Sequence, residues 1–240
     1  MGAVNNNKDY YLFIPKQILF WGKFNIKFVA VFIGEAIPEE LNAYRDNIVL
    51  WSKNLDLNTA FVAQNIRLYY PALINIPDDE MVMITDMDML PMSDRYYKEG
   101  LESYTIDDFV YYRKVDGNQI YMCYNAAHPK TWGKVFGITS DKDVETTIYD
   151  NYHKGYDGVP GSTGWFVDQL TMYTKLIDYP HLKVLNRPIK RIETWTYIAH
   201  LKSRHNDFIK YYDDAHFHRN YAKNEPFILD AERQLLANTA

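Results

Sequence analysis

The 240-residue chain has few of the features that mark secreted or membrane-spanning proteins. It contains one cysteine, Cys123, so no disulfide can form within the chain, and this favours a reducing compartment. No Asn-x-Ser/Thr sequon occurs, and the first residues lack the basic and then apolar pattern of a signal peptide. The longest purely apolar run, Phe28 to Ile33, is far too short to cross a bilayer. We therefore expect a cytoplasmic protein with no membrane span.

An excess of positive charge is also absent. Lys and Arg total 26 against 31 Asp and Glu, a formal net charge of -5. That balance offers no general attraction to nucleic acid, so we expect no nucleic-acid partner.

Hydrophobic residues make up 47% of the chain, which excludes a disordered protein. No Gly/Ser-rich linker divides the chain, so we interpret residues 1–240 as a single domain. The 21 Tyr, 12 Phe and 5 Trp suit stacking on sugars or nucleobases and equally suit a large core.

Hydrophobic patterning predicts helices and strands that alternate in the first half of the chain. Predicted helices cover Tyr10 to Trp21, Pro38 to Trp51, Thr59 to Leu73, Thr131 to Phe136, Asp141 to Lys154 and Trp165 to Ile177. Predicted strands cover Asn25 to Ile33, Met81 to Thr85, Phe109 to Arg113 and Gln119 to Tyr124. The alternation indicates an α/β fold with a mostly parallel sheet and helices on both faces, and a more mixed second half.

The most informative segment is MVMITDMDMLPMS, from Met81 to Ser93. An apolar strand ends there in two carboxylates, Asp86 and Asp88, which point the same way in an extended chain because they are two residues apart. Open α/β sheets bind ligands at the carboxyl ends of their strands. Two hard oxygen donors at that place suit Mn²⁺ or Mg²⁺ carrying a phosphorylated substrate. The competing interpretation is a pair of loop acids that cap the next turn.

This segment resembles the Asp-x-Asp motif of nucleotide-sugar-dependent glycosyltransferases of the GT-A fold. AQNIRLYYPAL, Ala63 to Leu73, is similar to the family helix before that motif, which implies that Gln64 and Arg67 face the donor nucleotide. GWFVDQLTMY, Gly164 to Tyr173, is similar to the acidic motif beside the acceptor. The polar run before YYLFIP is similar to the family's nucleotide-binding start. The resemblance extends over most of residues 5–175. Among family members, the chain is most similar to small single-domain transferases that build polysaccharides or viral glycans, including one from chlorella viruses.

The resemblance implies a three-layer α/β/α fold with a mostly parallel mixed central sheet and one glycosyltransferase catalytic domain. It implies a nucleotide-sugar donor that we expect to be UDP-linked, a glycan or other hydroxyl acceptor, and Mn²⁺ or Mg²⁺ as cofactor. A viral protein would act in the host cytoplasm. Asn5, Asn6 and Tyr10 would contact the nucleotide. One departure is the start, where only Met1 to Val4 precede the polar loop. Either the first strand is very short or the sequence is truncated there, and the role of Asn5 to Asn7 is open.

Roles for the acidic residues follow from the same comparison. Asp88 is expected to bind the metal directly, and Asp86 to bind it through water or to hold the ribose hydroxyls. Asp168 is expected to act as the base in an inverting transfer. Two alternatives remain: Asp168 caps its helix, or it belongs to the Asp-Gln pair found in some retaining relatives.

Many GT-A enzymes take a third metal ligand from a late His or Asp, and here His216 and His218 in DDAHFHRN are the candidates. His200 and His205 compete for this role. Arg219 is expected either to contact the diphosphate or to pair with the acidic residues at 213 and 214.

Three further residues have open interpretations. Tyr10 and Tyr11 either stack on the nucleobase or belong to the core, and Asn125 either binds a sugar or has a structural role. Cys123 is expected to be a buried small hydrophobe, not a nucleophile.

Two rival functions remain. One is a carbohydrate- or nucleotide-binding domain without turnover. The other is a phosphatase of the haloacid dehalogenase type, whose motif requires Thr or Val where Leu90 stands here.

Overall fold

The computed structural model describes residues 1–53, 56–159, 161–162, 164–203 and 208–237. The strands are β1 (Gly2–Asn5), β2 (Ala30–Ile33), β3 (Ile48–Trp51), β4 (Val82–Ile84), β5 (Met89–Pro91), β6 (Phe109–Tyr111), β7 (Asn125–Ala127), β8 (Leu182–Val184), β9 (Arg191–Glu193) and β10 (Asp214–His216). The α-helices are α1 (Lys8–Tyr11), α2 (Ile14–Lys23), α3 (Thr59–Tyr69), α4 (Arg95–Lys98), α5 (Pro129–Phe136), α6 (Asp141–Tyr152), α7 (Val167–Leu176), α8 (Thr194–Lys202) and α9 (Tyr221–Ala237). The 3₁₀ helices are η1 (Glu39–Asn47), η2 (Tyr70–Leu73), η3 (Gly164–Phe166) and η4 (Phe208–Tyr211).

The strands form a mixed arrangement in which the N-terminal part is parallel. β1, β2 and β3 pair in that order and in parallel. Beside them, β4, β7, β6 and β8 form a mixed sheet in which β7 runs antiparallel to both neighbours. Backbone contacts join the two sheets, because the Met1 carbonyl accepts from Thr85 at 3.0 Å and the Met1 amine donates to Met83 at 2.5 Å. A third sheet pairs β5, β10 and β9.

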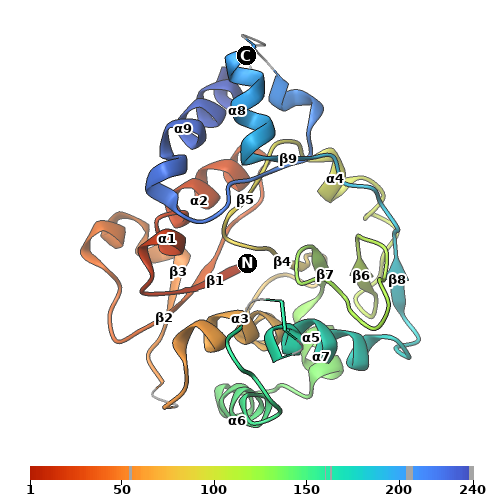
Figure 1. Ribbon diagram of the computed structural model, residues 1–240. Helices are drawn as coiled ribbons and strands as arrows, with labels where there is room; N and C mark the ends of the chain where they lie inside the picture. Colours follow the sequence, from red (N-terminus) through yellow and green to blue (C-terminus); the bar gives the residue numbers. More distant parts are fainter. Residues whose placement is uncertain (54–55, 160, 163, 204–207, 238–240) are drawn as a thin grey trace.

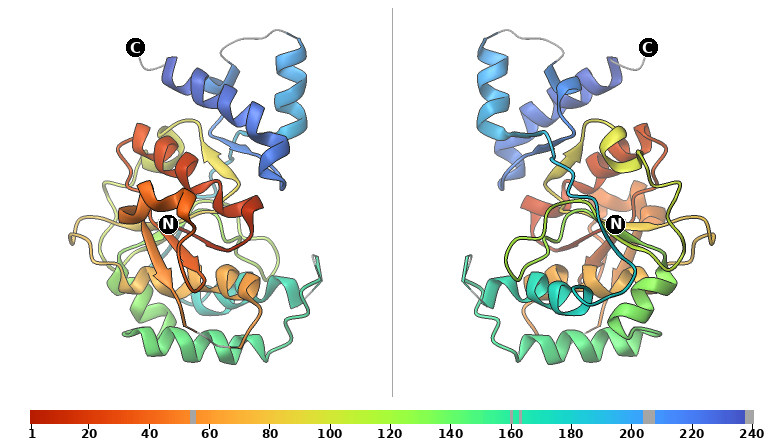
Figure 2. Two further views of the ribbon diagram at one scale, coloured as in Figure 1. Left: turned by 90° about the vertical axis from the view of Figure 1, so that its left-hand side faces the viewer. Right: turned by 90° about the vertical axis from the view of Figure 1, so that its right-hand side faces the viewer.

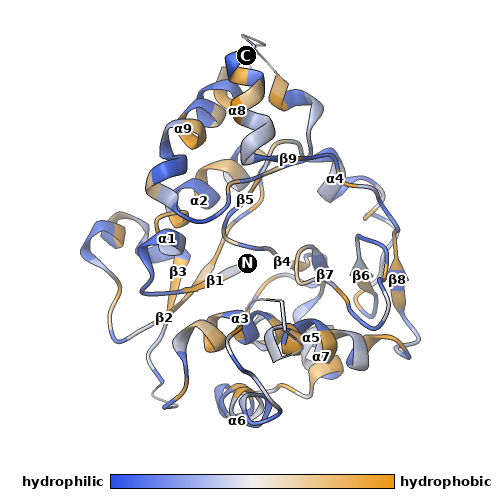
Figure 3. Ribbon diagram, in the orientation of Figure 1, coloured by the Kyte–Doolittle hydropathy of each residue, from blue (hydrophilic) through white to orange (hydrophobic). Residues whose placement is uncertain are grey.

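Side-chain alternation along β2 shows that helices cover both faces of this sheet. Ala30 and Phe32 belong to one hydrophobic cluster, whereas Val31 and Ile33 belong to the other. Successive strand residues point to opposite faces, so the fully buried AVFI sequence needs an apolar layer on each side. Figure 1 shows α1, α2 and α9 on one side and α3, α5, α6 and α7 on the other. Apolar segments concentrate on the strands between them (Figure 3). The mixed α/β, three-layer prediction is confirmed.

The C-terminal segment forms one end of the molecule. Figure 2 shows α8 and α9 at the end opposite α6, with the first strands between them. β10 and β9 connect this end to β5, so the last third of the chain reaches the middle of the structure. Among the described residues, no helix combines the length and apolar character needed to span a bilayer.

Several predicted elements were correct in kind but wrong in extent. The helix predicted over Tyr10 to Trp21 is two helices, α1 and α2, with Pro15 in the first turn of the second. The strand predicted from Asn25 begins at Ala30, because Asn25 has a φ of 55° in the turn that follows α2. The helix predicted over Thr59 to Leu73 changes to a 3₁₀ turn at Tyr70, next to Pro71. β1 is a short first strand of four residues, one of the two alternatives that the sequence left open.

Two predictions were wrong. Residues Ile48 to Trp51 form strand β3 instead of the end of a helix, since the preceding residues form only a 3₁₀ helix and IVLW pairs with β2. Gln119 to Tyr124 do not form a strand. The buried amide of Asn125 donates to the carbonyls of Tyr121 and Met122 at 2.7 and 3.1 Å, which curls this segment before β7 begins. Asn125 therefore has the structural role that its sequence left open.

One side chain of α2 fixes the backbone between β4 and β5, where the two aspartates lie. The Gln17 amide nitrogen donates to the carbonyls of Met87 and Met89 at 2.8 Å and to that of Asp86 at 3.2 Å. Its oxygen accepts from the Trp21 indole at 2.7 Å, and the residue is fully buried. A buried amide that satisfies carbonyl groups on a turn removes their desolvation cost and orders the turn.

We expect Gln17→Met to lower the free energy of unfolding by about 2 to 4 kcal/mol, since it leaves buried carbonyl groups and the indole N–H unpaired at similar side-chain volume. Urea denaturation followed by circular dichroism measures this change. Gln119→Met is the matched control and should change stability by less than about 0.5 kcal/mol, because no hydrogen bond of its side chain is present among the described residues. Equal stability of the two variants would contradict a clamping role for Gln17.

Candidate active site

A cavity of about 590 Å³ opens where β1 and β4 end. Asn5 is the last residue of β1, and Asp86 and Asp88 follow β4. The other walls come from α3, from the start of α7, and from the segment after β10. Its position at the carboxyl ends of two strands is the usual place for a ligand site in an α/β protein.

Most of the residues singled out in the sequence line this cavity. They are Asn5, Tyr10, Gln64, Arg67, Asp86, Asp88, Trp165, Asp168, His216 and Arg219. Asn6 is exposed and does not line it. His218 is also outside the lining, although its ring lies 3.8 Å from that of His216. The structure therefore gathers these residues from five separate stretches of chain around one space.

The guanidinium of Arg67 joins the first aspartate of the DMD segment to α7. It forms a short ion pair with Asp86, and its Nη2 lies 3.7 Å from Asp168 Oδ2. Burial by itself would raise the pKa of Asp86, but attraction to Arg67 and its hydrogen bond outweigh burial and lower that pKa. Asp86 is therefore ionised at neutral pH and is already paired with a cation.

Asp168 is the most deeply buried carboxyl group of the cavity, with its side chain 1% exposed. Burial raises the pKa of Asp168 to about 6, although Arg67 and hydrogen bonds from Gln169 and Gln64 act in the opposite direction. The Gln64 amide also donates to the Trp165 carbonyl at 2.7 Å and so links α3 to η3, which precedes α7. Close packing of this region requires glycine at 164, because a Cβ there would lie 2.4 Å from the Gly155 carbonyl.

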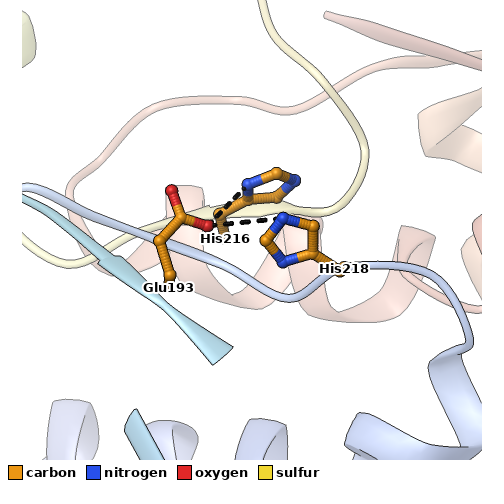
Figure 4. Close-up of side chains that lie close together, drawn as sticks. All are labelled: Glu193, His216 and His218. Carbon is orange, nitrogen blue, oxygen red and sulfur yellow. Dashed lines mark ion pairs between the residues drawn. The ribbon is translucent and has the colours of Figure 1, made fainter. Parts of the chain in front are cut away.

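Strand register brings a histidine next to the second aspartate. β10 lies between β5 and β9, and His216 is paired with Met89 on one side and Glu193 on the other. The Nε2 atom of His216 lies 3.6 Å from Asp88 Oδ2, and its Nδ1 lies 3.0 Å from Glu193 Oε2. His218 Nε2 lies 3.5 Å from the same glutamate oxygen, as Figure 4 shows.

Glu193, His216 and His218 have donor atoms that all lie within 4.8 Å of one another. Glu193 Oε2 and His218 Nδ1 are buried and lack a hydrogen-bond partner among the described residues. Carboxylate and imidazole donors together suit a divalent first-row ion. Burial opposes protonation of His216, but Asp88 and Glu193 outweigh it and raise its pKa; burial and His216 lower the pKa of His218. The donor set thus fits a cation.

The sequence did not predict Glu193 as a site residue. No local motif marks it, because its place beside His216 comes from the pairing of β9 with β10, two strands separated by more than twenty residues. Arg113, Tyr121 and Cys123 also line the cavity without having been predicted to do so. Cys123 is buried and burial raises the pKa of its thiol, which agrees with the expectation that it is not a nucleophile.

The remaining candidates lie elsewhere or have other partners. His200 stacks on Phe208 and lies 3.0 Å from the Tyr212 hydroxyl, and it is not a cavity residue. His205 is outside the described residues. Tyr11 is a core residue that donates to Glu40 at 2.7 Å, whereas Tyr10 lines the cavity.

Arg219 does not pair with the aspartates next to it in sequence. Asp214 is buried and bound by Arg191, with Nε to Oδ1 at 2.9 Å, and the Asp213 carboxylate accepts from the Lys190 backbone at 2.8 Å. The Arg219 guanidinium instead lies 5.6 Å from the Tyr10 ring centre and 5.9 Å from that of Trp165. It makes no ion pair with any described residue, so its charge is available to a ligand.

Comparison with known proteins shows similarity to solved structures but to no family model or curated protein. Among solved structures, the crystal structure of the galactosyltransferase LgtC in complex with donor and acceptor sugar analogs is similar over 96% of this chain and 94% of that chain. The identity is 14% and the TM-score is 0.48, values too low to transfer a function. The chemistry of the cavity residues must therefore indicate the function.

The carboxylate and imidazole cluster predicts that Glu193→Gln weakens Mn²⁺ binding by about 10- to 100-fold, whether Glu193 binds the ion or orients His216. Trp195 provides the readout, since its ring stacks on His218 with a centroid distance of 4.9 Å. Mn²⁺ should quench the fluorescence of Trp195, which is obtained by subtracting the signal of Trp195→Phe from that of the parent protein. The control Glu102→Gln changes an exposed glutamate and should leave the titration unchanged. Parent-like affinity in Glu193→Gln would contradict the cluster as a metal site.

Proposed function

We propose that the protein is a metal-dependent glycosyltransferase that moves a sugar from a UDP-linked nucleoside-diphosphate sugar to a hydroxyl of a glycan. The observation that carries this proposal is the convergence of the DMD segment, the Gln64–Arg67 helix and the Asp168 segment on one cavity. These three segments are the ones on which the sequence resemblance to GT-A glycosyltransferases depends, and nothing in their spacing requires them to meet.

The charges of the cavity suit a nucleoside diphosphate. Arg67 is occupied by Asp86 and Asp168, which leaves Asp88 beside His216 for a cation and Arg219 for an anion. A divalent ion between Asp88 and the Nε2 atom of His216, whose Nδ1 faces Glu193 and would be oriented by it, with Asp86 contributing through water, would offset negative charge on the departing diphosphate. Arg219 would bind phosphate oxygens, and the Tyr10 ring beneath it would stack on the base. Asn5 is placed to hydrogen-bond the nucleotide from the end of β1.

Asp168 is the proposed base. It is a carboxylate at neutral pH that lines the cavity from the start of α7. A base there would accept the proton of an acceptor hydroxyl as that hydroxyl attacks the anomeric carbon, with inversion of configuration. Trp165 offers an aromatic face for a sugar in the same wall. Arg67 and Gln64 act as positioning residues that hold the carboxylate in place.

The two rival functions are separable from this one. A haloacid-dehalogenase phosphatase would use Asp86 as its nucleophile, but Asp86 is held by the Arg67 guanidinium, which weakens its nucleophilicity and restricts its approach to phosphorus. A binding domain without turnover would share the cavity and its charges. Slow release of UDP from UDP-sugars in the presence of Mn²⁺ distinguishes turnover from binding alone.

Asp88→Ala should weaken binding of UDP in the presence of Mn²⁺ by at least about 100-fold, because it removes the carboxylate that faces His216. Isothermal titration calorimetry measures the affinity, and circular dichroism checks that the variant is folded. Asp178→Ala, which removes an exposed aspartate outside the cavity, is the control. Undiminished binding by Asp88→Ala would show that Asp88 is not a metal ligand.

Asp168→Asn should preserve UDP binding and reduce UDP release from UDP-sugars by about 100- to 10,000-fold. In the parent enzyme the rate should fall about tenfold per pH unit below pH 6, since the pKa of Asp168 is raised to about 6 and only the ionised form accepts a proton. Initial rates between pH 5 and pH 8 test this, with Asp150→Asn, an exposed aspartate of α6, as the control. Normal turnover by Asp168→Asn would eliminate it as the base.

A further inference from the structure

A second cleft, of about 490 Å³, adjoins the cavity. The two share Arg113 and Tyr121 as lining residues. Its walls are the chain after β6 and the chain after β8, which lie side by side on the right of Figure 1. Backbone hydrogen bonds of 2.8 Å from Leu185 to Tyr111 and from Arg187 to Tyr112 hold these segments together beyond the strand ends. The cleft is therefore a built extension of the cavity.

The lining of this cleft is basic. It contains Arg113, Lys114 and Arg187 against one carboxylate, that of Asp116, in a chain whose net charge is -5. Asp116 accepts a hydrogen bond from the Tyr121 hydroxyl at 2.9 Å. None of the three cations forms an ion pair with a described residue. Three cations gathered against a single carboxylate on an otherwise acidic protein attract an anionic group electrostatically.

Each cation has a distinct place in the cleft. The Arg113 guanidinium is half-buried, lies 4.2 Å from the Tyr121 ring centre, and contacts the Cys123 sulfur at 3.4 Å, so it is fixed at the junction of the two spaces. Arg187 is held by the carbonyls of Tyr96 and Glu99, the second at 2.6 Å. Lys114 is exposed and has no polar side-chain contact with a described residue. Two guanidinium groups are thus held in place by the contacts above, and one ammonium group is exposed.

The cleft is close to the proposed base. The backbone N–H of Ile120, next to Tyr121, bonds to the carbonyl of Gln169 at 3.4 Å, and Gln169 follows Asp168. We propose that the cleft binds a negatively charged group, a carboxylate or a phosphate, carried by the sugar acceptor, so that the enzyme acts on an acidic glycan. This rests on the proposed glycosyl transfer. The acceptor would place its hydroxyl at Asp168 and its anionic group between Arg113 and Lys114, where guanidinium and ammonium donors match anionic oxygens.

Binding of charged and neutral sugars to the full chain tests this proposal. The probes are a galacturonic acid tetramer with maltotetraose as its neutral counterpart, and glucose 6-phosphate with glucose as its counterpart, each titrated by calorimetry in metal-free buffer. We expect at least one acidic probe to bind about tenfold more tightly than its neutral counterpart, with an affinity that falls as salt is added. The tetramer reports a carboxylate site and glucose 6-phosphate a phosphate site. The proposal would be overturned if each acidic probe bound with the same affinity as its neutral counterpart.

Charge reversal locates the binding. Lys114→Glu should weaken binding of the acidic probe about tenfold and leave UDP binding with Mn²⁺ unchanged, because Lys114 lines the basic cleft only. Lys27→Glu reverses an exposed lysine outside both spaces and should have little effect. Equal weakening by both variants would show a general charge effect and refute the cleft. If the protein without substitutions did not bind UDP with Mn²⁺, the glycosyltransferase function would be refuted, and binding of the acidic probe could still be measured.

Discussion

The ion pairs of Arg67 are the interaction on which the rest of the site depends. One guanidinium, 11% exposed, lies between Asp86 after β4 and Asp168 at the start of α7. Three charges are expensive to bury, and they are tolerated only because each carboxylate faces a cation that cannot lose its proton. These ion pairs therefore join the DMD segment to the start of α7. They also leave the two aspartates of the motif with different tasks, since Asp86 is neutralised and Asp88 is not.

This division of charge explains why the cavity suits a ligand that carries both signs. With Arg67 occupied, Asp88 and the cluster at His216 form a negative region, and the unpaired Arg219 and Arg113 form positive regions. A neutral sugar alone would need neither the negative region nor the positive regions. A diphosphate bound to a divalent ion needs both, at separate places, because its oxygens attract cations and its metal requires anionic ligands. The proposed nucleotide-sugar ligand depends on this separation of charges.

The sequence predicted those parts of the site that depend on local structure. Gln64 and Arg67 are three residues apart on a helix and so share a face, and Asp86 and Asp88 directly follow an apolar strand. Glu193 and Arg113 could not be predicted in this way, because strand pairing between distant segments places them. The same limit applies to IVLW in β3, whose four apolar residues fit the end of a helix and a buried strand equally well.

Long-range pairing also explains how the last third of the chain, where the resemblance is weakest, supplies the cavity with a histidine. His216 reaches Asp88 only in the observed register of β10, and a shift of one residue would turn its side chain to the other face. Asp214 fixes that register. It lies two residues earlier on the same face, is fully buried, and accepts from Arg191 of β9 and from the Tyr124 hydroxyl. Any slip would leave these buried charges unpaired, so the ion pair of Arg191 with Asp214 holds Glu193 opposite His216.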